Sequence, residues 1–78
     1  MNSLCQISPQ IREMPEDFYP LFKNDSSTIR ARYDYGGRQL EIGTETPSPA
    51  ERERTIWALK FALWQQVEFM RIKAEEVV

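Results

Sequence analysis

The chain has 78 residues and a net charge of −2, with 41% of its residues hydrophobic and 28% charged. This length allows one domain, which buries only about 60% of the surface that its unfolded form exposes. Small domains of this kind often gain further burial from a second subunit. The slightly acidic balance argues against a protein that binds nucleic acid or anionic membranes by positive charge alone.

Cysteine and histidine usage restricts the chemistry. Cys5 is the single cysteine and histidine is absent, which excludes an internal disulfide and a zinc site built from these ligands. Cys5 also lacks a histidine base, so we interpret it as a small packing residue. Acidic pairs such as Glu16 and Asp17 are interpreted as solvated charge, because acid–base catalysis needs a carboxyl with a shifted pKa beside a pocket. No enzyme activity, cofactor or metal is expected.

Residues 1–27 are expected to be largely irregular, because three closely spaced prolines interrupt any long helix. Within them, Ser3–Ile7 is a candidate for a third strand. The aromatic residues of this segment are expected to press onto an apolar surface elsewhere in the chain; they are Phe18, Tyr19 and Phe22. No basic stretch followed by an apolar run occurs here, so no signal peptide is predicted and a cytoplasmic location is expected.

Residues 28–44 are predicted to form a β-hairpin with Gly36 and Gly37 as its two-residue turn. Pairing outward from the turn places Tyr33 opposite Leu40, and a slip of one residue would destroy the match of apolar with apolar side chains. The predicted inner face consists of Ile29, Ala31, Tyr33, Leu40 and Ile42. The predicted outer face consists of Arg30, Arg32, Asp34, Gln39 and Glu41. The two glycines are explained by the turn and do not indicate a phosphate-binding loop.

Arginines gather on or beside this outer face, namely Arg30, Arg32 and Arg38. A two-stranded ribbon can enter the major groove of DNA, and arginine is the usual reader of guanine. A nucleic-acid-binding regulator is therefore an alternative function. Asp34 and Glu41 share the face and neutralise it, which favours a polar patch that sets specificity in protein recognition.

Residues 48–75 are predicted to form one long helix that begins with a capping box, with Ser48 as N-cap, Pro49 at the first position and Glu51 three residues after the cap. No later proline or glycine interrupts it. Its apolar stretch is crossed by charged and amide side chains such as Lys60 and Gln65. A membrane span needs about 20 predominantly apolar residues, so no span is predicted.

The apolar residues of this helix fall into two stripes. The first, expected to cover the hairpin, consists of Ile56, Leu59, Leu63, Val67, Met70 and Ala74. The second consists of Trp57, Phe61, Trp64 and Ile72, with Glu68 among them, and Phe69 lies further round. One hairpin covers one stripe, so the aromatic stripe needs another cover. The candidates are the N-terminal aromatic residues, a second copy of the chain, or a target protein.

The expected fold is α+β, a β-hairpin packed on one long C-terminal helix in a single domain. The expected function is a small non-catalytic protein-interaction module, a homodimer through antiparallel helices, that binds and inhibits or adapts a larger protein. The expected partner or dimer interface consists of Trp57, Phe61, Trp64 and Phe69. No motif assigns the chain to a family; by kind, such proteins are frequent among inhibitors that phages and mobile elements direct at host machinery.

Overall fold

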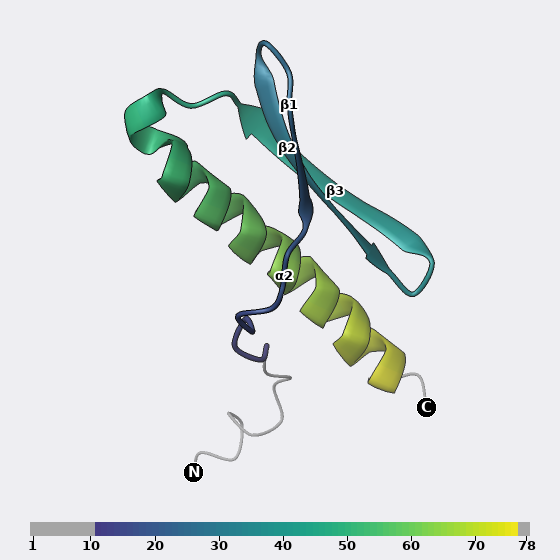
Figure 1. Cartoon of the computed structure of the whole chain (residues 1–78). Helices are drawn as coiled ribbons and strands as arrows, with labels where there is room; N and C mark the ends of the chain where they lie inside the picture. The colour runs from purple at the N-terminus through teal and green to yellow at the C-terminus, as the bar shows by residue number, and fades with distance from the viewer. Residues whose placement is uncertain (1–10, 77–78) are drawn as a thin grey trace.

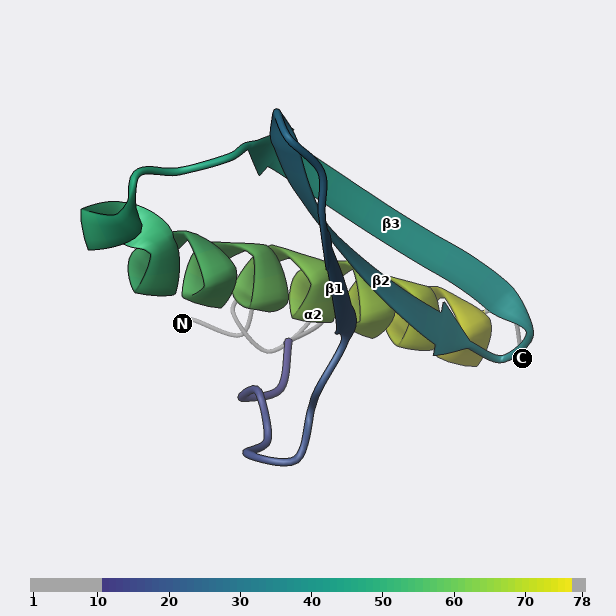
Figure 2. The ribbon, with the colours of Figure 1, turned by 45° about the horizontal axis from the view of Figure 1, so that its top comes forward.

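The structure, a computed structural model, describes residues 11–76. It contains three strands followed by one helix: β1 (Leu21–Asn24), β2 (Thr28–Tyr35), β3 (Arg38–Glu45), a single 3-10 turn η1 (Pro49–Glu51) and α2 (Arg52–Glu76). The strands form one antiparallel sheet in the order β1-β2-β3. Figures 1 and 2 show this sheet lying along one side of α2. The predicted α+β architecture is confirmed.

The third strand of the sheet is β1, which begins directly after Pro20. It pairs with β2 so that Leu21 lies opposite Arg32 and Asn24 opposite Ile29. The sequence predicted a largely irregular segment over residues 1–27, but its last part forms this strand. A proline beside β1 is tolerated because β1 is an edge strand. The candidate strand Ser3–Ile7, with Cys5, lies outside the described residues.

The hairpin of β2 and β3 has the predicted register, with Tyr33 opposite Leu40 and Ala31 opposite Ile42. Gly36 and Gly37 have φ values of +58° and +84°. Both values are positive, as a type I′ hairpin turn requires. On the inner face Ile29 and Ala31 are completely buried, so the predicted inner face is confirmed where the hairpin meets the helix.

The helix begins less regularly than the predicted capping box implies. Ser48 has extended backbone, but its side chain makes no capping hydrogen bond to the helix backbone. The Glu51 N–H instead donates to the Ser48 carbonyl oxygen at 2.9 Å, and the Ser48 hydroxyl faces the Glu51 carboxylate at 3.5 Å. This i to i+3 bond closes a 3-10 turn over Pro49–Glu51 before the α-helix begins.

A candidate membrane span is absent from residues 11–76, because α2 does not combine the length and the apolar character that a spanning helix needs.

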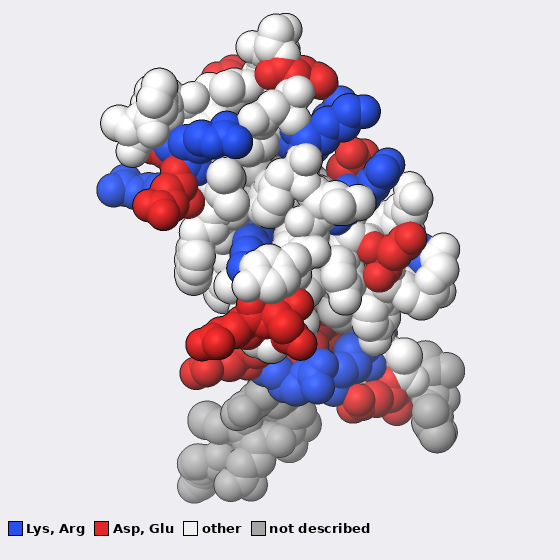
Figure 3. Space-filling model, viewed as in Figure 1, with Lys and Arg blue, Asp and Glu red and all other residues white. Residues whose placement is uncertain are grey.

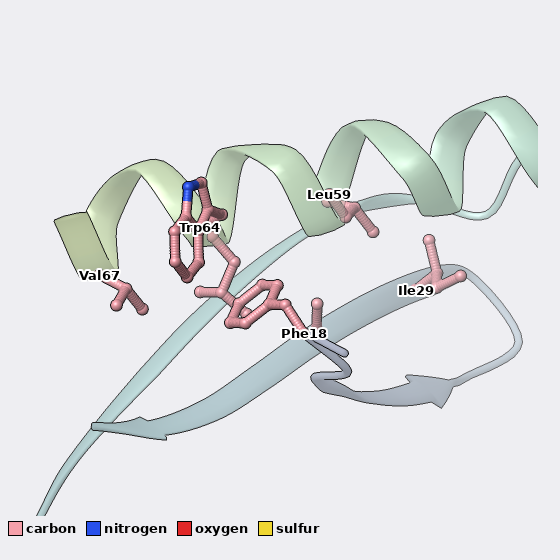
Figure 4. Packing of buried hydrophobic residues seen from close by; sticks show 7 residues of the cluster. Phe18, Ile29, Leu59, Trp64 and Val67 are labelled. Atoms are coloured by element: carbon pink, nitrogen blue, oxygen red, sulfur yellow. The ribbon is translucent and has the colours of Figure 1, made fainter. Parts of the chain in front are cut away.

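The hydrophobic core lies between the inner face of the sheet and α2. From the first stripe of the helix it contains Leu59, Leu63 and Val67, so this stripe faces the sheet as predicted. Trp64 of the second stripe also belongs to the core. The segment before β1 adds Phe18, whose ring centroid lies 4.7 Å from that of Tyr33 and 5.1 Å from that of Trp64. Figure 4 shows the Phe18 ring between the sheet and Trp64. One of the three predicted N-terminal aromatic residues therefore completes the core.

Candidate interaction surface on helix α2

Residues 11–20 cross α2 and are held there by Glu68, whose side chain is fully buried. Three groups of Arg12 donate hydrogen bonds to the Glu68 carboxylate. The backbone N–H lies 2.9 Å from Oε1, Nε lies 3.0 Å from Oε1, and Nη2 lies 2.9 Å from Oε2. Arg71 adds a further bond from Nη2 to Oε1 at 3.0 Å. This ion pair explains why an acidic residue stands in the aromatic stripe of the helix.

The hydrogen bonds keep the Glu68 carboxylate charged. The bond from the Arg12 side chain, followed by that from Arg71, lowers the pKa of Glu68 from 4.5 to about 2, although burial acts in the opposite direction. The same contacts raise the pKa of Arg12 and of Arg71. Glu68 is therefore a carboxylate at neutral pH, and it attaches the N-terminal segment to the helix instead of exchanging protons.

Trp64 forms the second attachment of this segment. Its indole Nε1 donates a hydrogen bond of 2.7 Å to the Arg12 carbonyl oxygen, and the Arg12 guanidinium lies 5.8 Å from the Trp64 ring centroid. The side chain of Trp64 is only 7% exposed and packs against Phe18. The structure thus places Trp64 in the interior of the chain, where a second protein cannot reach it. Of the three candidate covers, the N-terminal segment covers this part of the stripe.

The beginning of the aromatic stripe remains uncovered. Trp57 is 57% exposed and Phe61 is 38% exposed. Their rings stack with centroids 5.2 Å apart and planes 7° apart. The pair lies one to two turns before Trp64, beyond the stretch of helix to which Arg12 attaches. These two residues of the expected interface therefore do lie together at the surface.

A groove of about 530 Å³ lies between this aromatic pair and the N-terminal segment. Its helix side is formed by Trp57, Lys60 and Phe61. Its other side is formed by Glu13, Met14, Pro15, Glu16 and Tyr19. The Lys60 ammonium lies 4.6 Å from the ring centroid of the exposed Tyr19. Figure 3 shows acidic side chains gathered where the N-terminal segment crosses α2 in Figure 1. The groove thus combines aromatic rings with negative charge.

Phe69 lies on a different side of α2 and is 60% exposed. Ala58, Ala62 and Gln65 precede it by eleven, seven and four residues, a spacing that places all four on one helix face. Ala58 is exposed, and Ala62 and Gln65 are half-buried. The expected interface residues therefore divide into a surface pair, an interior residue and a separate exposed ring.

The predicted arginine patch lies on the outer face of the sheet. The Arg30 guanidinium forms an ion pair of 2.8 Å with Asp25. Arg32 lies opposite Glu41, and Arg38 lies beside the turn. Acidic residues thus accompany two of the three arginines, an arrangement that does not favour binding to phosphates.

The Arg12 contacts with Glu68 and Trp64 were missed by sequence reasoning. The available signal was the single acidic residue within an otherwise apolar stripe, which calls for a basic partner when buried. Nothing in the sequence marks Arg12 as that partner. Among residues 11–76, no group of three or more histidine, cysteine, aspartate or glutamate side chains is arranged to hold a metal ion.

No protein-family model, curated protein or solved structure matches the chain. Its function is therefore inferred from the geometry of the surface on α2.

Proposed function

We propose that the protein is a small, non-catalytic interaction module that binds a larger protein through the groove beside Trp57 and Phe61, and thereby inhibits or adapts it. The stacked, uncovered pair of aromatic rings carries this proposal. Aromatic side chains are enriched at protein interfaces, where a few of them supply most of the binding energy. Exposed rings beside a groove are typical of such a site.

The attachment of residues 11–20 supports the proposal because it fixes one side of the groove. Arg12 is bound to Glu68 and Trp64, and Phe18 is buried in the core. Met14, Pro15 and Tyr19 line the groove from positions between or beside these fixed residues. A surface held in place before binding loses less conformational entropy when a partner binds.

Trp57→Ala is expected to reduce capture of the partner from lysates of the native source by about tenfold or more, because truncation of a central interface aromatic is costly. The measurement is affinity capture with quantitative mass spectrometry. Leu21→Ala is the matched control, because Leu21 is also an exposed apolar residue but lies on β1. Circular dichroism should show both variants folded. Equal capture by the wild type and Trp57→Ala would contradict the proposal.

The Phe69 face further suggests pairing with a second copy of the chain. In an antiparallel pair of α2 helices with the two-fold axis midway between Ala58 and Phe69, the Phe69 ring of each copy lies level with Ala58 of the other. A large exposed ring then meets small side chains, Ala58 and Ala62. A two-fold interface uses the same surface on both copies, so each contact of this kind occurs twice.

Sedimentation equilibrium at micromolar concentration is expected to give twice the chain mass of 9.2 kDa. Phe69→Ser should shift the protein to the monomer, because it removes the ring that meets Ala58. Trp57→Ala should leave the dimer unchanged, since Trp57 lies on the groove side of the helix. A monomeric wild-type protein would contradict self-association through this face.

A further inference from the structure

We infer that the groove selects an arginine-bearing segment of its partner, whose guanidinium stacks on the Trp57 indole and pairs with Glu13 or Glu16. This inference rests on the proposed function, because it names the chemistry of the segment that the groove binds. Its evidence comes from the chain's own Arg12, from the charge of the groove and from the chemistry of the guanidinium group.

The chain already binds one arginine in this way. The Arg12 guanidinium lies 5.8 Å from the Trp64 ring centroid, and it donates two parallel hydrogen bonds, of 3.0 Å and 2.9 Å, to the Glu68 carboxylate. Trp57 precedes Trp64 by seven residues, so both indoles lie on the same side of α2. The groove thus presents a second indole, with carboxylates supplied by the N-terminal segment.

The charges around the groove favour a cation. Glu13 and Glu16 line it, and within residues 11–76 neither forms an ion pair. The exposed Asp17 follows directly and adds negative charge. Lys60 is the basic residue of the lining, and its ammonium is already placed over the Tyr19 ring. Trp57 is the exposed tryptophan of the described chain, and no side chain of residues 11–76 places a cation over its ring.

Arginine fits these groups better than lysine or an apolar side chain. Its planar guanidinium stacks on an aromatic ring while donating two hydrogen bonds to a carboxylate, whereas lysine offers a point charge. Its aliphatic stem can pack on Met14 and Phe61. A purely apolar segment would remove water from Glu13 and Glu16 without providing hydrogen bonds in return, which is costly.

The test measures binding of fluorescein-labelled eight-residue peptides to the full chain by fluorescence anisotropy. One peptide alternates leucine and arginine, a second carries lysine in place of arginine, and a third carries citrulline, which keeps the shape of arginine but is uncharged. The arginine peptide is expected to bind about tenfold or more tightly than the citrulline peptide, with the lysine peptide between them.

Two matched double variants locate the effect. The double variant Glu13→Gln with Glu16→Gln should bind the arginine peptide about tenfold more weakly than the wild type does. Its affinity for the citrulline peptide should equal that of the wild type. The double variant Glu41→Gln with Glu45→Gln changes the net charge by the same amount, but both residues lie on β3. Its affinity for each peptide should equal that of the wild type. Trp57→Ala should weaken both peptides, because it removes the ring on which either side chain stacks.

Equal affinity of the wild type for the arginine and citrulline peptides would overturn the inference. The proposed function would then still be supported if capture of the partner protein from lysates depends on Trp57. The inference also fails if no peptide binds, or if the β3 variant weakens binding as much as the groove variant. If the wild type is a dimer and Trp57→Ala is a monomer, the groove binds a second copy of the chain, and the inference is likewise overturned.

Discussion

Replacing Phe18 with alanine is expected to lower the free energy of unfolding by about 3–5 kcal/mol, the usual cost of truncating a buried phenylalanine. Phe18 is almost fully buried and its ring contacts Tyr33 of the sheet and Trp64 of the helix. Its loss leaves a cavity where the sheet, the helix and the N-terminal segment meet. A domain of 78 residues has a total stability of roughly 4–12 kcal/mol. The free energy of unfolding of Phe18→Ala should therefore be close to zero or only slightly positive.

The measurement is urea unfolding followed by tryptophan fluorescence and far-ultraviolet circular dichroism. Tyr19→Ala is the matched control, because Tyr19 is the next residue and is 73% exposed. A change within about 0.5 kcal/mol is expected for this control, as for most surface substitutions. Similar unfolding curves for Phe18→Ala and the wild type would show that the N-terminal segment does not contribute to the core.

Glu68→Gln is expected to lower the stability at pH 7 by about 1.5–3 kcal/mol, the usual contribution of a hydrogen bond to a charged group. Glutamine keeps the shape of the side chain but removes the charge that binds Arg12 and Arg71. Glu75→Gln removes an exposed ion-pair partner of Arg71, and a change below about 1 kcal/mol is expected for it. Urea unfolding of the three proteins makes the comparison.

The effect of Glu68→Gln should depend on pH. The pKa of Glu68 falls from 4.5 to about 2 on folding, so the unfolded chain binds the proton more readily than the folded one. The stability that the carboxylate contributes is therefore fully present above about pH 4.5 and is lost as the pH falls towards about 2. The difference between the wild type and Glu68→Gln should shrink over this interval. A difference that stays constant from pH 7 to pH 2 would contradict the assigned role of Glu68.

The hairpin and the helix were predictable because their signals are local. Two adjacent glycines identify the turn, and alternation on both sides fixes which residues face the core. The helix stripe of Leu59, Leu63 and Val67 repeats at the spacing of a buried face. β1 is too short to show such alternation, and its four side chains are all exposed. Its place in the sheet follows from backbone pairing with the edge of β2, which a pattern of buried side chains does not predict.

The division of the aromatic stripe could not be predicted, because Trp57 and Trp64 occupy equivalent positions on the helix. Their exposure differs because residues 11–20 cover one and leave the other beside a groove. That difference depends on contacts between Arg12 and Glu68, which are separated by 56 positions. Periodicity describes the faces of one element and contains no information about such distant pairing.

The contacts of Arg12 also have a consequence for the order in which the molecule assembles. Closing a loop of 56 positions costs more chain entropy than closing the hairpin, so the N-terminal segment is expected to dock after the hairpin and helix have formed. For the same reason this segment is expected to detach in local opening events before the rest of the domain unfolds. One side of the groove is thus expected to be the last part of the fold to form and the first to separate when the domain opens.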